Sequence, residues 1–219
     1  MASFEIVVRN RASLHPGGEP TQFVSEYSGV IVCTDDETGE EMRVGRLTAL
    51  RVHAGLAQNA GESLFDVCDA YSSELQALHT FLYEPHGYGF QPEFAMRFDA
   101  IESDLLVLDY VILCPKWRQL KLGLLAVRKF VDLVGDGCGL AVSFVAPLRN
   151  SAAKMLRVPA KWIPRHASKE DRRAATVRLR RYFRRMGFQR LGRTQYYALS
   201  LNQRTPTAEE LLGGLPPGS

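Results

Sequence analysis

The chain has 219 residues, of which 46% are hydrophobic and 23% charged, and its net charge is +3. These totals are typical of one globular domain. No apolar run approaches the roughly 20 residues of a membrane-spanning helix, and the N-terminal MASFEIVVRN lacks the pattern of a signal peptide. The four cysteines form no C-x-x-C pair, which predicts reduced thiols in a cytoplasmic protein. We expect one domain over residues 1–201 and a flexible tail over 202–219, which is rich in glycine and proline.

The charge is unevenly distributed. Between Arg165 and Arg193 there are eleven basic and two acidic residues, whereas the rest of the chain is acidic. A basic segment of this kind indicates a polyanionic partner such as nucleic acid. An ordinary solvated helix face is the alternative, and the composition does not separate the two.

The first half of the chain predicts mainly strands. Residues 4–9 alternate weakly and favour a short strand. The runs 23–34 and 41–52 are strand-like and are joined by the turn sequence DDETG at 35–39. Together they predict an antiparallel hairpin.

The middle of the chain predicts a crossover between parallel strands. Apolar residues at helical spacing over 64–82 predict a helix with Ser63 as its N-cap. The run 104–115 is almost continuously apolar, as in a strand that is covered on both faces. A helix over 122–134 and a buried strand over 140–145 follow. A strand, a helix and a strand in this order form a right-handed parallel crossover.

The last third predicts a helix over 169–186, a stop at Gly187, and two strands over 188–191 and 195–201. The fold class that results is α/β, more closely α+β. We expect a mixed, mostly antiparallel twisted sheet with flanking helices.

The junction between the strand at 104–115 and the helix at 122–134 has the chemistry of an anion site. The first N–H groups of a helix have no partner within it, and the helix dipole places positive charge there. Such an end binds phosphate groups. Arg118 and Lys121 add two formal charges to the same turn, so the sequence predicts a phosphate-bearing ligand at this junction.

In this turn the chain resembles the GNAT family of acyltransferases. The family's signature is a strand that ends in V-x-P, followed by Q/R-x-x-G-x-G/A at the start of a helix that clasps the pyrophosphate of coenzyme A. Pro115, Arg118 and Gly123 stand at matching positions, and Lys121 stands where the signature has its middle glycine. Lysine restricts the approach of the backbone to a pyrophosphate, although its ammonium group adds a point charge.

The resemblance extends from about residue 104 to residue 201. The run YFRRMGF at 182–188 is similar to the family's late helix, which ends in Gly-Phe and precedes two strands. Asn150, three residues before Ala153, resembles the family's N-x-x-A near the pantetheine arm. The resemblance implies a GNAT-like acyltransferase fold with acetyl-CoA or another acyl-CoA as co-substrate.

The resemblance also implies which residues bind the coenzyme. They lie in or beside the turn, apart from one that follows the next strand: Leu113, Cys114, Arg118, Gln119, Leu120, Lys121, Leu122, Gly123 and Asn150. In the family the strand before the turn splays from its neighbour. A backbone N–H near Leu113 or Cys114 can then polarise the thioester carbonyl.

Two residues are candidates for catalysis. Asp109 lies in the apolar strand, where an unpaired carboxyl has a raised pKa and suits proton abstraction from an ammonium group. A structural salt bridge with an arginine of the late helix is the alternative. The family's tyrosine, the acid for the leaving thiolate, corresponds to Phe183, and Tyr182 is about 100° away around the helix, so its side chain is expected to point elsewhere.

The function that this sequence favours is acyl-CoA-dependent N-acyl transfer, by direct attack of an amine of a small molecule or protein. One alternative is a GNAT-like protein that binds coenzyme A without turnover, because of Phe183 and Lys121. A second is a polyanion- or RNA-binding protein that uses the arginine-rich helix. No residue spacing predicts a metal site.

Overall fold

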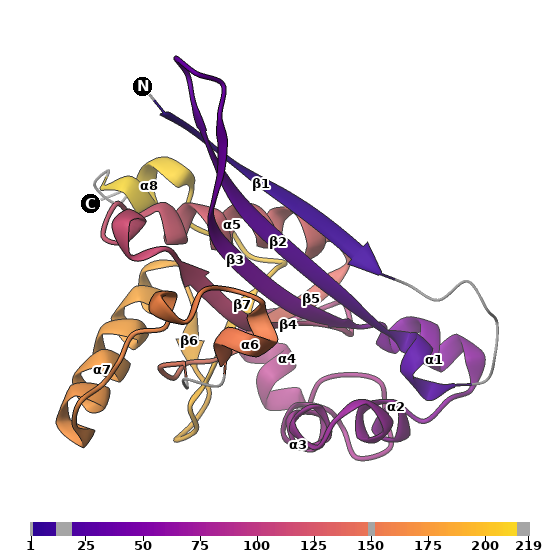
Figure 1. Cartoon of the computed structure of the whole chain (residues 1–219). Coiled ribbons are helices and arrows are strands. Elements are labelled where there is room, and N and C mark those ends of the chain that lie inside the picture. Colours follow the sequence, from indigo (N-terminus) through magenta and orange to yellow (C-terminus); the bar gives the residue numbers. More distant parts are fainter. Residues whose placement is uncertain (1, 12–18, 149–151, 214–219) are drawn as a thin grey trace.

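The structure is a computed structural model that describes residues 2–11, 19–148 and 152–213. Its centre is one seven-stranded sheet in the order β1-β2-β3-β4-β5-β7-β6 (Figure 1). The strands are β1 Ala2–Arg11, β2 Val24–Asp35, β3 Glu41–Val52, β4 Asp104–Leu113, β5 Cys138–Phe144, β6 Gln189–Arg190 and β7 Tyr196–Ser200. Strands β4 and β5 pair in parallel, and every other neighbouring pair is antiparallel. The expected mixed, mostly antiparallel sheet is confirmed.

Helices cover both faces of the sheet. The helices are α1 Ala54–Ala60, α2 Leu64–Tyr71, α3 Ser73–Leu82, α4 Pro92–Phe98, α5 Leu122–Val134, α6 Ala152–Leu156, α7 Lys169–Arg185 and α8 Ala208–Leu212. Short 3-10 turns span Pro20–Phe23, Pro115–Trp117 and Ala160–Trp162. One core lies between the sheet and α5, the end of α7 and α8, and a second lies between the opposite face and α1 to α4.

The β2–β3 hairpin forms because its turn residues satisfy the backbone locally. The Asp35 carboxylate accepts hydrogen bonds from the N–H groups of Glu37 (2.9 Å) and Thr38 (3.1 Å). Gly39 adopts the left-handed conformation with φ of 70°, which glycine reaches without a steric cost. The predicted hairpin is therefore confirmed, with both strands twelve residues long.

The predicted crossover is also confirmed. Strand β4 runs through α5 into the parallel strand β5, and α5 has the predicted bounds 122–134. One side of this helix is buried against the sheet through Leu124, Val127, Phe130 and Val131. The crossover places the start of α5 at the end of β4, where the anion site is expected.

The helix expected over 64–82 was wrong in one respect, because the segment forms two helices. Ser72 lies between α2 and α3 in an extended conformation, and its hydroxyl accepts a hydrogen bond from the Leu75 N–H (3.1 Å). A serine that caps a new helix offers the backbone an alternative to continuing the old one. Ser63 caps α2 as expected, by accepting from the Asp66 N–H (3.3 Å).

The segment 202–219, expected to be a loose tail, contains a short helix. The Thr207 hydroxyl caps α8, and Leu211 is buried in the core beside α5. Residues 214–219 lie outside the described part of the chain. The cysteines are free, as expected: Cys33, Cys68 and Cys138 are buried, and Cys114 is half-buried.

Candidate functional site

The sheet opens at Asp109. In the pairing of β3 with β4, Thr48 faces Tyr110 and Ala49 faces Leu108, so Asp109 is the extra residue of a β-bulge. On the other side, β4 pairs with β5 only as far as Leu108 opposite Ser143. A bulge redirects a side chain and ends regular pairing. From Asp109 onward, β4 therefore leaves β5.

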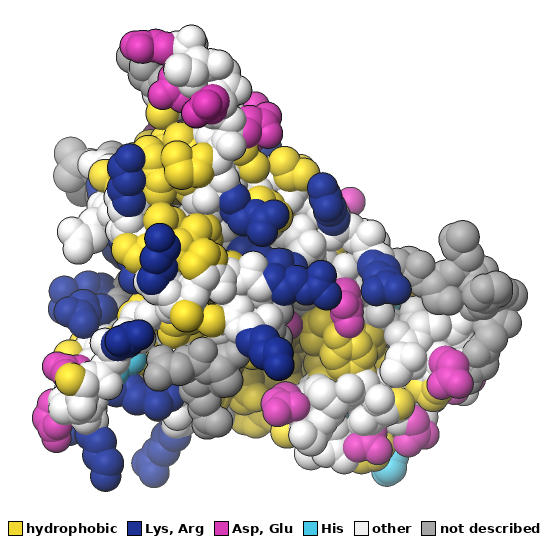
Figure 2. All heavy atoms as spheres, viewed as in Figure 1, with side chains coloured by type: hydrophobic (Ala, Val, Ile, Leu, Met, Phe, Trp, Pro, Cys, Tyr) yellow, Lys and Arg dark blue, Asp and Glu magenta, His cyan; other side chains and the backbone are white. Residues whose placement is uncertain are grey.

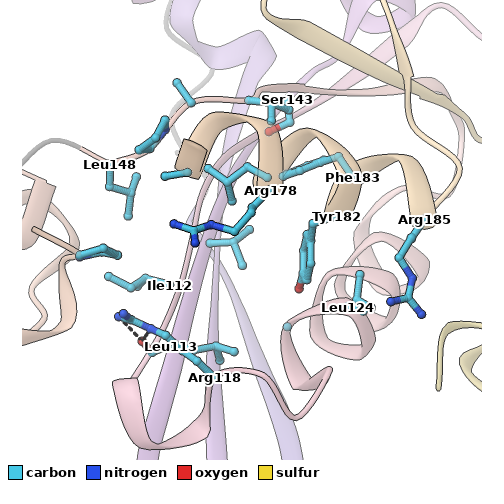
Figure 3. A pocket seen from close by; sticks show the side chains of 18 of the residues that line it. Ile112, Leu113, Arg118, Leu124, Ser143, Leu148, Arg178, Tyr182, Phe183 and Arg185 are labelled. Carbon is cyan, nitrogen blue, oxygen red and sulfur yellow. Dashed lines mark hydrogen bonds between the residues drawn. The ribbon is translucent and has the colours of Figure 1, made fainter. Parts of the chain in front are cut away.

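A cavity of about 550 Å³ lies where the two strands separate. Its walls come from the second half of β4, the turn before α5, the segment after β5, and one side of α7 (Figure 3). Eight of the residues predicted for the site line it: Asp109, Leu113, Arg118, Gln119, Lys121, Leu122, Gly123 and Tyr182. Cys114 and Leu120 are not among its lining residues, and Asn150 lies outside the described part of the chain.

The turn before α5 presents backbone donors. Gln119 and Lys121 are both left-handed, with φ of 69° and 58°. No described residue accepts a hydrogen bond from the N–H groups of residues 119–123. Successive N–H groups in such a turn form a concave site for an anion. The predicted cradle thus has free backbone donors.

The two cationic side chains of the turn are bound to the protein itself. Arg118 donates to the Leu113 carbonyl through Nε (3.1 Å) and Nη2 (2.9 Å), and also to the Trp162 carbonyl. Lys121 donates to the Leu212 carbonyl. Both residues line the cavity, but their charged groups bind backbone carbonyls. The sequence had predicted that these groups would be free in the turn.

Tyr182 lies in the cavity wall, contrary to the expectation that it points elsewhere. Its hydroxyl reaches the first turn of α5, where a Cβ on Gly123 would overlap it. Burial raises the pKa of Tyr182, so the phenol is protonated near neutral pH. Phe183 also lines the cavity, but its ring packs against Phe188 in the core.

Asp109 lines the same cavity as the turn and has an acidic environment. Desolvation raises its pKa to about 7, and the negative charges of Glu26 and Glu74 contribute. Asp109 is an exposed residue that lines the cavity, so the protein atoms around it desolvate the carboxyl only in part. Asp109 forms no ion pair with another described residue, so the alternative of a salt bridge to the late helix is not borne out.

The neighbours of Asp109 come from distant parts of the chain. Glu26 is on β2 and accepts a hydrogen bond from the Tyr71 hydroxyl (2.8 Å), while Glu74 lies in the first turn of α3. Sequence reasoning missed both glutamates, and it also missed His166, which lines the cavity with an Nε2 atom that has no described partner. No local pattern marks these residues, because only the fold brings the two glutamates near Asp109 and His166 to the cavity.

Arg178 brings a positive charge to the cavity from α7. Figure 3 shows its side chain directed into the space between α7 and β4. Arg185, the last residue of α7, lines the cavity as well. The other arginines of the helix are largely on its outer side, and Figure 2 shows basic side chains gathered over this region.

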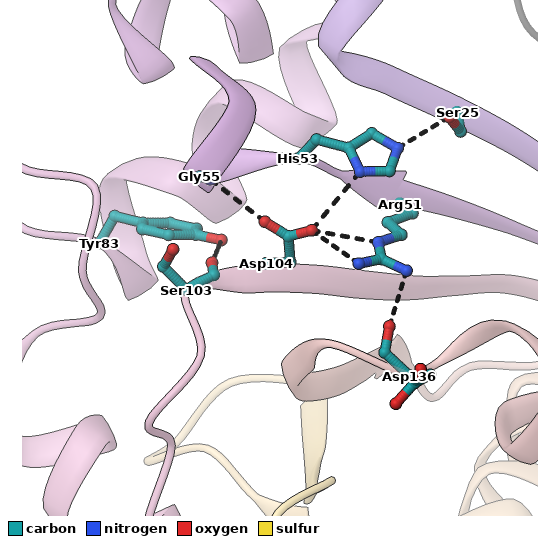
Figure 4. A network of polar contacts seen from close by, with 8 residues as sticks. All are labelled: Ser25, Arg51, His53, Gly55, Tyr83, Ser103, Asp104 and Asp136. Carbon is teal, nitrogen blue, oxygen red and sulfur yellow. Dashed lines mark hydrogen bonds and ion pairs between the residues drawn. The ribbon is translucent and has the colours of Figure 1, made fainter. Parts of the chain in front are cut away.

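A second polar cluster lies near the start of β4 (Figure 4). Ser25 Oγ is 2.8 Å from His53 Nε2, and His53 Nδ1 is 3.4 Å from Asp104. Arg51 donates twice to the same carboxylate, at 2.9 and 3.1 Å, and the Gly55 N–H donates at 3.2 Å. Despite the serine–histidine–aspartate order, Ser25 is only 9% exposed and none of these residues lines the cavity. The cluster joins β2, β3, β4 and α1, which is a structural role.

Among the described residues, no group of three histidine, cysteine or acidic side chains is placed to hold a metal ion. None of the described helices combines the length and apolar character needed to cross a bilayer. Comparisons with protein-family models, curated proteins and solved structures find no match to this chain.

Proposed function

We propose that the protein is a GNAT-like N-acyltransferase that transfers an acyl group, such as acetyl, from coenzyme A to a positively charged amine. The observation that carries the proposal is the cavity where β4 leaves β5. It joins a turn of free backbone N–H groups to a carboxyl whose pKa is near neutrality. The N–H groups suit the phosphates of the acyl donor, and the carboxyl suits a positively charged amine acceptor.

The donor is proposed to bind along the cavity from the turn before α5. The N–H groups of residues 119–123 suit the pyrophosphate, and Arg178 supplies a formal charge near it. Beyond Leu108 the open side of β4 offers backbone groups that β5 does not pair. One of these N–H groups is proposed to polarise the thioester carbonyl.

The acceptor is proposed to approach from the side of Asp109. The carboxylates of Glu26, Glu74 and Asp109 attract an ammonium group to this end of the cavity. Asp109 takes one proton from the ammonium, and the amine nitrogen then forms a bond with the thioester carbon as the carbon–sulfur bond breaks. The nitrogen releases its second proton to solvent as the amide forms. Tyr182 is the candidate donor of the proton that the thiolate receives, since its phenol lines the same cavity.

The test is calorimetric titration with acetyl-CoA, followed by measurement of free thiol released in the presence of a panel of amines. Arg178→Ala is expected to weaken binding about tenfold, as for the loss of one charged hydrogen bond. Arg173→Ala is the matched control, because Arg173 is an exposed residue of the same helix that does not line the cavity. Absence of binding at millimolar acetyl-CoA refutes the proposal.

The second candidate is a protein that binds coenzyme A without turnover. It is favoured by Arg118 and Lys121, whose charged groups bond to backbone carbonyls rather than facing an open turn. Binding of acetyl-CoA without thiol release for any amine, with the same response to Arg178→Ala, supports this candidate over the enzyme.

A further inference from the structure

Strand β1 leaves one edge of the sheet open. All ten of its residues pair with β2, from Ala2 opposite Asp35 to Arg11 opposite Glu26. Its other edge pairs with no described strand (Figure 1). A long edge strand without proline, bulge or cover is a template for pairing with another strand.

The two faces of β1 differ in chemistry. Ile6 and Val8 point towards α5 and pack against its core. The opposite face carries Glu5, Val7 and Arg9, and Val7 is 42% exposed. The open edge is therefore flanked by an apolar row on one side and a charge–apolar–charge row on the other.

An apolar groove of about 490 Å³ runs beside this edge on the α5 face. It lies between Phe4 and Ile6 of β1 and Leu125, Lys129 and Leu133 of α5. Phe4 is 38% exposed and Leu133 is 51% exposed. The edge leaves backbone groups of β1 without a described strand partner. The groove beside it leaves Phe4 and Leu133 partly exposed, although Phe4 also contacts the ring of Trp117 edge-on.

We propose that this surface is a self-association interface, in which β1 pairs antiparallel with β1 of a second copy around a two-fold axis at Val7. In that register Val7 faces the partner's Val7, and Glu5 faces the partner's Arg9 on both sides of the axis. On the α5 face, Ile6 lies opposite the partner's Val8. The sheet continues across the axis, and the two α5 helices lie on the same side of it.

The sequence of β1 favours a second copy of the same strand as its partner, and it favours one register of the pair. An axis at Glu5 or at Arg9 would place like charges opposite each other, which is destabilising. An axis at Ile6 places Glu5 opposite the partner's Val7, and an axis at Val8 places Val7 opposite the partner's Arg9. Only the axis at Val7 pairs opposite charges and also pairs apolar with apolar residues, as a self-complementary interface requires.

The test is sedimentation equilibrium of the full chain and of charge-reversal variants. The wild-type chain is expected to dimerise at about 100 μM or below. Glu5→Arg or Arg9→Glu alone makes both charge pairs repulsive and is expected to weaken the dimer by about tenfold or more. Glu41→Arg, an exposed reversal on β3 away from this edge, is the control and leaves the dimer unchanged.

The mixed experiment tests the register itself. A dimer of one Glu5→Arg chain with one Arg9→Glu chain has an arginine opposite a glutamate at both places, so mixing the two variants restores dimers. The double variant Glu5→Arg/Arg9→Glu restores them as well. Circular dichroism of each variant separates a loss of pairing from a loss of folding. A monomeric wild type, single reversals that dimerise like the wild type, or a mixture without recovery overturns the proposal.

Discussion

The protonation of Asp109 sets the expected pH dependence of the proposed reaction. Its pKa is raised to about 7 by desolvation and by the nearby Glu26 and Glu74. A general base acts in its ionised form, which is about one tenth of the population at pH 6 and about nine tenths at pH 8. Because an alkylammonium acceptor keeps its own charge over this interval, the turnover number should rise about tenfold from pH 6 to pH 8 and then level off.

The variant Asp109→Asn removes the base and keeps the size of the side chain. We expect it to lower the turnover number by a factor of about 10² to 10⁴. We also expect it to abolish the step near pH 7, that is, the rise in turnover number between pH 6 and pH 8. Glu74→Gln removes a like charge, so it should move the midpoint of the wild-type step to lower pH. Thiol release from acetyl-CoA is the assay, and Asp69→Asn, an exposed acid of α2, is the control. A step near pH 7 that survives Asp109→Asn would refute the assignment.

The same raised pKa predicts an effect on stability that does not depend on activity. The folded state binds a proton at Asp109 more tightly than the unfolded chain, whose carboxyl has the ordinary pKa of 3.8. The stabilising contribution is present below about pH 4 and is lost as the pH rises through about 7. Asp109→Asn should therefore raise the Tm at pH 8 and change it little at pH 4, by a modest amount because solvent screens the exposed carboxyl.

Two further predictions concern positions with matched controls. Gly123→Ala should lower stability and acetyl-CoA affinity, because the new Cβ would overlap the Tyr182 hydroxyl. The control is Gly55→Ala, also at the second position of a helix, where a Cβ meets nothing closer than 3.9 Å; it should be neutral or stabilising by up to about 1 kcal/mol. Thermal unfolding measures the stability of both variants, and calorimetry measures their affinity for acetyl-CoA. Asp104→Asn should cost about 1–3 kcal/mol at pH 7 against about 0.5 kcal/mol or less for the surface pair lost in Asp132→Asn. Since the pKa of Asp104 is lowered, the stability that the ionised Asp104 contributes should be lost as the pH falls below about 4. A stability difference between the two variants that is the same at pH 3 and pH 7 would contradict the reasoning.

The elements that the sequence predicted best have a strong local signal. The hairpin β2–β3 combines alternating runs with a turn sequence whose Asp35 and Gly39 have defined roles. Helix α5 has a buried side that repeats at helical spacing over thirteen residues. Such signals come from residues near each other in the chain, so they need no knowledge of the tertiary structure.

The elements that the sequence missed are short or depend on one side chain. Helices α1 and α4 have seven residues each, which is too few for a periodic pattern to be distinct. The break between α2 and α3 rests on the Ser72 cap, and apolar residues continue on both sides of it. Helix α8 is held by the burial of Leu211 against the main core, a contact that only the fold creates.

The candidate site divides in the same way. Asp109 stood out because a charged residue in an apolar strand is unusual, and the turn before α5 stood out by its spacing. Glu26 and Glu74, whose charges act on Asp109 from β2 and α3, and Arg178, which lines the cavity from α7, could not be predicted. Their relation to Asp109 is set by strand pairing and helix packing, which the local sequence does not encode.

The structure also changes the role expected for Arg118. Its guanidinium donates hydrogen bonds to the carbonyl of Leu113 at the end of β4 and to that of Trp162. These bonds restrain the conformation of the turn. The turn holds two non-glycine residues, Gln119 and Lys121, in the left-handed conformation, which costs about 1 kcal/mol each relative to glycine. A turn with this cost needs such support to keep its N–H groups outward. Arg118 therefore positions the backbone that meets the anion, and Arg178 is the side chain that brings a positive charge into the cavity from α7.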